Sequence, residues 1–462
     1  MGMVVESVCT VDVTYCEGWD PVARAASTLV PESEARRRDE SGEPYAVLLS
    51  FQGQAKALFQ VDWRHGYLGL FLFDGQARRT QEYQYRQLEA GRLHLRRYEQ
   101  RRPASGTGTG TDSPEGAWRF TLTISPDGRA RRKLDSGGSL QVGTDVPAEH
   151  RTVAKAEFGA WAGYVDARML GLTGPIALVP TPPRAETPVS HGEASWSAPM
   201  PLQPRHLEAL FTPGTRLASD EERTAVIAEP ARAGLLSLPT GSVIAGDPFT
   251  IHGAPPFTVT VPPGDYPVLI STMRWEGDDW GETPAAMLRI LDKPAVTWEP
   301  ALRPGEDARL LGSGEFYGFG VDSGTACFLD ASGRDTLPKI CEHQLTEWEA
   351  DRHSCAVSDP ASGINLIAYL SGYGDGSYPV WIGRDAEGAV TCFVADMLVL
   401  HNAEALPPTV TRPAVCVSPF SGQVTDRRDA PFTDPGSTSE YMKSQIADIV
   451  EFQQELRSRR PY

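Results

Sequence analysis

Short apolar runs separated by glycine, proline and aspartate recur along this chain, and residues 371–396 show the pattern most fully. A glycine-spaced loop precedes an alternating run at 378–382, residues 385–388 have the composition of a turn, and an apolar run follows at 389–400. Alternation with a period of two, bounded by turn residues, is typical of β-strands. The stretch therefore predicts a β-hairpin.

The same pattern predicts a mainly β chain. The second half has short apolar runs between dense turn signals and lacks the repeated helices that a doubly wound α/β fold requires. We expect two β-sandwich or barrel-like domains. Strands are expected in the first half at residues 45–50, 55–63, 67–73, 81–87, 92–100, 118–124 and 129–134.

Proline content and charge predict the domain boundaries. Residues 175–204 contain eight prolines and are expected to be a linker. We expect β-rich domains at 1–174 and 205–405, and an irregular segment with a terminal helix at 406–462. Residues 1–185 hold 23 Lys and Arg against 22 Asp and Glu, a net charge of +1, whereas the rest hold 20 against 38, a net charge of −18. The acidic part is unsuited to nucleic acid or anionic lipid and suits a basic partner or a divalent cation.

Two segments have helical spacing. In residues 156–170, Phe158, Trp161, Val165 and Met169 recur at helical intervals and are expected to pack in the core. A second helix is expected in residues 437–460, where it either docks on its own domain or makes a homo-oligomer contact. The apolar face of this second helix is formed by Met442, Ile446, Ile449 and Leu456.

Cysteine usage and hydropathy predict the compartment. The seven cysteines are scattered and form no dense disulfide framework. No secretory signal is recognisable at the N-terminus, and no run approaches the ~18–20 apolar residues that span a bilayer. We therefore expect a cytoplasmic protein with reduced thiols and no membrane contact.

Four motifs in the acidic half, taken in order, resemble a known family. They lie at residues 245–248 (AGDP), 257–267 (FTVTVPPGDYP), 316–330 (FYGFGVDSGTACFLD) and 372–379 (GYGDGSYP), and the apolar run at 382–400 follows. The segment 190–405 resembles the bacterial family named domain of unknown function 4241. The resemblance implies one structural unit and no established activity, and it does not extend to the N-terminal domain.

The motif loops carry the candidate chemistry in five aspartates, which are Asp247, Asp322, Asp330, Asp375 and Asp396. Carboxylates on glycine-rich loops suit Ca²⁺ or Mg²⁺, and paired carboxylates serve as general acid and base. The alternative is that each Asp bonds its own turn. We select Asp322, Asp375 and Asp396 as candidate catalytic residues, with Asp322 and Asp375 as candidate metal ligands.

Other residues in the motifs are candidate binding groups. Tyr373, Tyr378 and Thr325 are predicted to contact a ligand, whereas Cys327, beside Phe328 in an expected strand, is predicted to be a buried, inert thiol. The sequence has no G-x-S-x-G elbow and no phosphate-binding loop.

Two further patterns are weaker. Cys341, His343, His353 and Cys355 have the composition of a zinc site, but one-residue gaps place paired ligands on opposite sides of a strand, so zinc is not expected. The arginine-rich run at 92–102 favours a solvated sheet face over a site for an anionic partner.

The sequence favours a binding or accessory protein without chemistry of its own, acting as a scaffold or in the manner of bacterial immunity proteins. No complete catalytic set is visible, whereas loops and acidity favour recognition of a protein or a small molecule. The alternative is a metal-assisted hydrolase or isomerase that uses the aspartates, or a tailoring enzyme for a small molecule.

Overall fold

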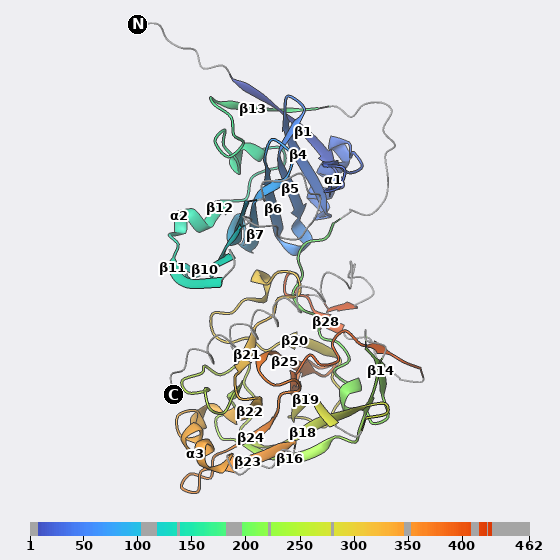
Figure 1. Cartoon of the computed structure of the whole chain (residues 1–462), viewed down its shortest axis with the longest axis vertical. Coiled ribbons are helices and arrows are strands. Elements are labelled where there is room, and N and C mark those ends of the chain that lie inside the picture. Colours follow the sequence, from blue (N-terminus) through green and yellow to red (C-terminus); the bar gives the residue numbers. More distant parts are fainter. Residues whose placement is uncertain are drawn as a thin grey trace. The chain divides into compact units, whose positions relative to one another are not determined.

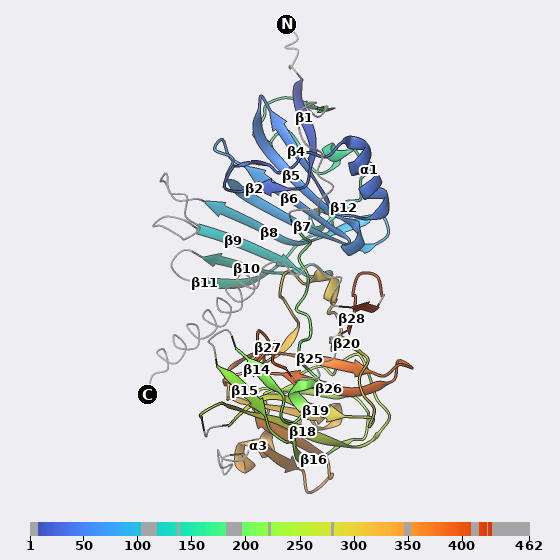
Figure 2. The ribbon, with the colours of Figure 1, turned by 90° about the vertical axis from the view of Figure 1, so that its right-hand side faces the viewer.

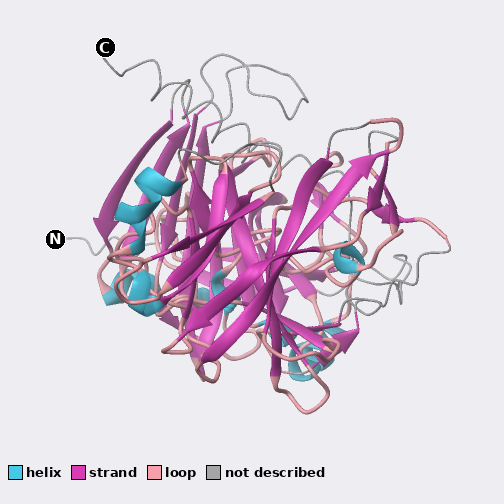
Figure 3. Cartoon of the chain, turned by 90° about the horizontal axis from the view of Figure 1, so that it is seen from below, coloured by secondary structure: helices cyan, strands magenta, loops and turns pink. Residues whose placement is uncertain are grey.

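A computed structural model of the chain describes residues 8–102, 118–135, 139–181, 196–219, 223–278, 281–345, 353–407, 415–422 and 424–426 (Figure 1). The chain divides into two compact units, residues 1–198 and 199–462, and the division falls inside the proline-rich segment 175–204. Strands dominate the described residues and the helices are short (Figure 3). The prediction of a mainly β chain is confirmed.

The first unit is built on one curled sheet (Figure 2), which has eleven strands among the described residues. Neighbouring strands are antiparallel, with one exception. Strands β1 and β13, the first and the last of this unit along the chain, pair in parallel. The spatial order is β11 (Ser139–Asp145), β10 (Arg129–Asp135), β9 (Trp118–Ile124), β8 (Arg92–Arg102), β7 (Arg79–Glu89), β6 (Tyr67–Phe73), β5 (Gln54–Asp62), β4 (Tyr45–Phe51), β1 (Cys9–Cys16) and β13 (Ile176–Pro180), with β12 (Thr152–Ala154) paired to β8.

The two faces of this sheet are covered differently. Helix α1 (Glu32–Ser41) and the 3₁₀ turn η2 (Trp161–Gly163) pack on one face, over an aromatic core around Phe59 and Trp161. The hairpin of β2 (Trp19–Asp20) and β3 (Ala25–Ala26) covers part of the other face. Short helical elements η1 (Trp63–His65) and α2 (Ala148–Arg151) lie in connections.

The prediction of a helix at 156–170 is wrong. Among these residues only η2 is helical, and turns and irregular backbone form the rest. The spaced apolar side chains do pack in the core, with Trp161 and Val165 buried and Phe158 and Met169 against them. Spacings of three and four residues fit successive turns as well as a helix. The predicted C-terminal helix at 437–460 lies outside the described residues.

The second unit contains a large sheet of twelve strands among the described residues. Its path is β27 (Glu404–Ala405), β14 (Arg216–Ala218), β15 (Thr224–Ile227), β18 (Gly264–Trp275), β19 (Gly281–Arg289), β26 (Val390–Asp396), β25 (Gly376–Arg384), β20 (Thr297–Pro300), β28 (Val415–Val417) and β29 (Val424–Asp426). Two strands pair beside this path, β16 (Ala231–Leu238) with β18 and β21 (Gly318–Val321) with β25.

A smaller sheet packs on the large one to form a sandwich. Its strands are β17 (Val243–Gly246), β22 (Thr325–Asp330), β24 (Asn365–Leu370) and β23 (Ser354–Ser358). Phe328 and Tyr369 of the small sheet pack with Phe393 of β26 in the core between the sheets. Helix α3 (Leu337–Gln344) covers the outer face of the small sheet. The outer face of the large sheet is covered by loops and by η3 (Ala209–Phe211); η4 (Ala308–Leu310) and η5 (Ala331–Gly333) lie in connections.

The predicted hairpin at 371–396 is confirmed as β25 and β26. These strands lie inside the large sheet, flanked by β19 and β20. In the turn between them, the Asp385 carboxylate accepts from the Glu387 and Ala389 amides at 3.1 and 2.8 Å.

Candidate functional site

Two of the predicted loops lie side by side. Pairing of β21 with β25 sets Val321 opposite Gly376, so the segments carrying Asp322 and Asp375 are neighbours. The Ser371 amide also donates to the Gly324 carbonyl at 3.2 Å. Asp322 is exposed and Asp375 is half-buried. The register therefore brings these two acidic positions to one end of the large sheet.

The Asp247 carboxylate is hydrogen-bonded to the backbone of the loop that carries Asp322. Its Oδ2 accepts from the amides of Asp322 and Ser323, each at 2.9 Å, and its Oδ1 accepts from the Phe249 amide at 2.9 Å. The carboxylate is buried, and these three bonds replace the water that it loses. Asp247 is therefore a structural anchor that joins residues more than seventy positions apart.

Replacing Asp247 with alanine is expected to destabilise the second unit by about 2 kcal/mol, because three partly buried hydrogen bonds to backbone amides are lost. Denaturant unfolding measures the stability, and amide hydrogen exchange at Asp322 and Ser323 should accelerate. Asp322→Ala is the matched control, since that side chain is exposed. Equal effects of the two substitutions would contradict the anchoring role.

Asp396 is buried at the end of β26. It is the last residue of β26, is paired with Ala285 on β19, and is 2 % exposed. The Leu398 amide donates to its Oδ1 at 2.8 Å, and Oδ2 has no hydrogen-bond partner of ordinary geometry among the described residues. Burial raises the pKa of Asp396 to about 7, and the Leu398 amide and the Trp381 indole only partly offset this effect.

Of the remaining motif residues, Tyr378, Thr325 and Asp330 are buried and Tyr373 is exposed. Tyr378 is a core residue whose hydroxyl donates to the Gly374 carbonyl at 2.8 Å, and burial raises its pKa to about 12. Thr325 is buried in β22, and Tyr373 is 68 % exposed. Asp330 accepts bonds from Thr240 and from Ser332, and so joins β22 to the loop before β17.

Among the described residues, no group of three or more His, Cys, Asp or Glu side chains is placed to hold a metal ion. Cys341 is buried on α3 and Cys355 is half-buried on β23. His353 Nδ1 lies 3.1 Å from the Thr283 hydroxyl. Cys327 is buried, and burial raises the pKa of its thiol well above the ordinary value, as expected for an inert thiol.

The arginine-rich strand β8 is not a solvated face. His94, Arg96 and Glu99 are each at most 5 % exposed. Glu99 accepts from Arg97 at 2.8 Å and also from Arg101. The expectation of a solvated face was therefore wrong. Alternation in the sequence predicts which side chains share a face of the strand, but it does not predict whether other parts of the chain cover that face.

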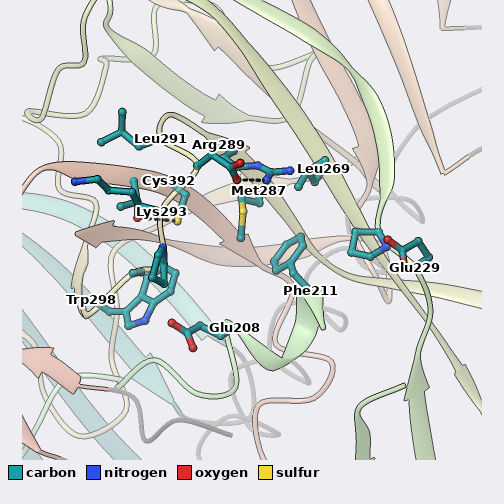
Figure 4. Close-up of a pocket in the computed structure, with 15 residues that line it drawn as sticks. Glu208, Phe211, Glu229, Leu269, Met287, Arg289, Leu291, Lys293, Trp298 and Cys392 are labelled. Atoms are coloured by element: carbon teal, nitrogen blue, oxygen red, sulfur yellow. Dashed lines mark hydrogen bonds and ion pairs between the residues drawn. The ribbon is translucent and has the colours of Figure 1, made fainter. Parts of the chain in front are cut away.

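A pocket of about 460 Å³ opens on the outer face of the large sheet (Figure 4). Its floor is a set of side chains from four strands of the sheet: Leu269 of β18, Met287 and Arg289 of β19, Cys392 of β26 and Trp298 of β20. Phe211 of η3 and Glu208 beside it form one wall, Glu229 and Pro230 a second, and the 291–295 loop a third.

Gly383 shapes the pocket floor. The register sets it between Cys392 and Trp298, in the row that lines the pocket. A Cβ at this position would lie 2.8 Å from both the Cys392 Sγ and the Ala295 Cβ. Because glycine has no side chain, Ala295 and Cys392 can pack directly against its backbone. A larger residue at this position would push them apart.

The charged groups of the pocket are partly paired. Arg289 Nη1 lies 2.7 Å from Asp292 Oδ1. Lys293 Nζ lies 2.8 Å from Asp385 and 3.2 Å from Glu387, both outside the lining. No hydrogen bond or ion pair joins the Glu229 carboxylate to another described residue.

The Cys392 thiol is buried at the pocket floor. Burial raises the pKa of its thiol to about 11; the nearby Glu208 carboxylate adds to the shift and Arg289 opposes it. The thiolate, which is the reactive form, is therefore scarce at neutral pH.

None of the predicted site residues lines this pocket. Its residues come from separate segments between positions 208 and 392, and only their placement in one sheet joins them. One signal was visible in the sequence: Arg289 follows alternating apolar residues at 285 and 287, so it shares their face. A charged residue on an apolar face marks either a sheet edge or a site.

Residues 236–395 match the model of a family described as "Protein of unknown function (DUF4241)", as the motif resemblance predicted. The matched segment includes both acidic loops and, except for the last residue of β26, the strands that form the floor of the pocket. No curated protein and no solved structure matches the chain. No helix among the described residues is long and apolar enough to cross a membrane. The cytoplasmic location stays a prediction.

Proposed function

We propose that the second unit is a binding module and that the pocket on β18, β19, β26 and β20 is its ligand site. The observation that carries this proposal is the pocket itself. About 460 Å³ is within the size range of small-molecule sites, and the lining combines apolar side chains with charged ones that could orient a ligand. Trp298 and Met287 supply that apolar surface.

The groups around the pocket support binding without chemistry. The thiol at its floor is protonated at neutral pH, and the described residues offer no metal group. An accessory role as a carrier, a sensor or a neutraliser of a small molecule agrees with these properties.

Filling the pocket tests this proposal. A metabolite library is screened by ligand-observed NMR against the full chain, and compounds that bind are retested on Leu269→Trp, which fills the pocket. Leu235→Trp is the matched control, because Leu235 lies on β16 of the same sheet and is 47 % exposed. We expect Leu269→Trp to weaken binding at least tenfold and Leu235→Trp to leave it unchanged. No binding compound, or equal loss in both variants, would contradict the proposal.

A metal-assisted hydrolase or isomerase is the second candidate, and the adjacent loops of Asp322 and Asp375 favour it. Two loop carboxylates with glycine carbonyls nearby are hard oxygen donors of the kind that Ca²⁺ and Mg²⁺ prefer. Thermal unfolding with Ca²⁺ or Mg²⁺ tests the candidate. Stabilisation that Asp375→Asn abolishes would support it, and no stabilisation by either ion would exclude it.

A further inference from the structure

We propose that strands β8, β9 and β10 of the first unit bind single-stranded nucleic acid, with bases in an apolar groove and phosphates at nearby arginines. This surface belongs to a different unit from the pocket, so the inference goes beyond the function proposed above. The arginine-rich run at 92–102 forms β8, one of its three strands.

A groove of about 530 Å³ lies on one face of these strands, and Gln100, Trp118, Phe120 and Leu134 line it. The register brings them together, because Phe120 on β9 pairs with Gln100 on β8 and with Leu134 on β10. Trp118 lies two residues before Phe120 on the same strand and so shares its face. Leu134 is 39 % exposed, and both rings are half-buried. The groove therefore presents aromatic rings to a ligand.

Two tyrosines continue this row of rings across the neighbouring strands. The Tyr98 ring on β8 lies 6.3 Å from the Phe120 ring and 4.9 Å from the Tyr83 ring on β7, measured between centroids. Bases of single-stranded nucleic acid stack on such rings whatever their sequence, since every base has an aromatic face. The face of β7, β8 and β9 thus has the surface that unpaired bases require.

The strands that form the groove carry an excess of positive charge. Residues 92–135 hold ten Lys and Arg against five Asp and Glu, a net charge of +5 in a chain whose net charge is −17. Arg132 is exposed, and alternation along β10 places it on the same face as Leu134. Arg119 and Arg131 are exposed on the opposite face of the same strands. Charges act over about 10 Å at 0.1 M salt, so both faces contribute to the attraction of an anion.

A buried carboxylate holds two of the exposed arginines in place. Glu99 is 2 % exposed; it accepts a hydrogen bond from Arg101, and Arg119 Nε lies 3.5 Å from its Oε1. Arg101 also reaches Glu82 at 3.6 Å. The Arg101 and Arg119 side chains are still 44 % and 52 % exposed. A guanidinium has five N–H donors, so both can also donate to phosphate oxygens.

Single-stranded nucleic acid fits this surface better than other polyanions do. In a duplex the faces of the bases are stacked on one another, so the Trp118 and Phe120 rings would have nothing to stack on. An acidic peptide matches the positive charge but has no reason to use the row of rings. Only a strand with unpaired bases uses the rings and the arginines together.

The test is the fluorescence anisotropy of a labelled twelve-nucleotide oligothymidylate, titrated with the full chain at pH 7.5 and 50 mM salt. We expect a dissociation constant on the order of 10 µM, in the range of binding without sequence preference. At 200 mM salt the affinity should fall about 20-fold, which is the effect of three phosphate contacts. A twelve-base-pair duplex should bind at least fivefold more weakly.

Variants separate the rings from the charges. Trp118→Ala and Phe120→Ala should each weaken binding at least fivefold, whereas Trp118→Phe retains a ring and should stay within threefold of the wild type. Arg132→Gln should reduce the slope of log affinity against log salt by about 0.7. Arg64→Gln is the matched control, because the Arg64 side chain is 58 % exposed on η1 of the same unit and lies outside these strands. It should change neither the affinity nor the slope, and circular dichroism checks that each variant is folded.

Four results would overturn the inference: no binding up to 200 µM protein, a duplex that binds as tightly as the single strand, equal affinities of Trp118→Ala and Trp118→Phe, or competition by a twelve-residue oligoglutamate as strong as by unlabelled oligothymidylate. Binding to vesicles with 30 % phosphatidylserine in place of the oligonucleotide would assign the surface to anionic lipid and would also overturn it. None of these results bears on the pocket of the second unit, which Leu269→Trp tests separately.

Discussion

Replacing Asp396 with asparagine is expected to change how the stability of the second unit depends on pH. The pKa of Asp396 is about 7 in the folded chain and about 3.9 when unfolded. The protonated acid therefore favours the folded state. This contribution is complete below pH 4 and is lost as the pH rises through 7.

The Asp396→Asn variant has no carboxyl group at this position, so it does not lose this stability as the pH rises. The difference in unfolding free energy, variant minus wild type, should rise by about 3–4 kcal/mol between pH 4 and pH 8, since one pKa unit corresponds to about 1.4 kcal/mol. Urea unfolding at a series of pH values measures it. Asp375→Asn is the control, because that carboxylate is half-buried on a loop. A difference that does not vary with pH would show that Asp396 is ionised in the fold.

Replacing Arg38 with methionine is expected to destabilise the first unit by about 3–5 kcal/mol, because it leaves a buried carboxylate without its partner. Arg38 Nη1 and Nη2 donate to the two Glu17 oxygens at 2.8 and 2.9 Å. The two side chains are 9 % and 4 % exposed. The pair fixes α1 on the segment that follows β1.

Two further variants test whether the loss of stability comes from burial of the ion pair or from the number of hydrogen bonds. Arg37 also makes four hydrogen bonds, to Glu34 and Glu43, but its side chain is 53 % exposed, so Arg37→Met should cost far less. Adding Glu17→Gln to Arg38→Met should recover most of the loss, because no buried charge then remains. Similar losses for Arg37→Met and Arg38→Met, by chemical unfolding, would contradict this explanation.

The strands were predictable from the sequence because their signals are local. The β25–β26 hairpin follows from alternation on both sides of a turn in which Asp385 bonds its own backbone. The segment 156–170 failed as a helix because its apolar spacing also fits turns that press Trp161 into the core. Local pattern therefore indicated the core residues more reliably than the backbone conformation.

The candidate site was not predictable because it depends on long-range register. Leu269, Arg289, Cys392 and Trp298 meet only because β26 and β25 insert between β19 and β20. Turn chemistry suggested that Asp247 would bond its own loop, and it does so at Phe249, but its other oxygen accepts from a loop seventy-five residues away. A single sequence carries no signal for such pairs.

A crystal structure of the full chain soaked with a compound that binds in the ligand-observed NMR screen tests the central claim most directly. We predict ligand density in the pocket over Cys392, in contact with Phe211 or Trp298. Density instead at the Asp322 and Asp375 loops, or an empty pocket at a saturating soak, would contradict the account.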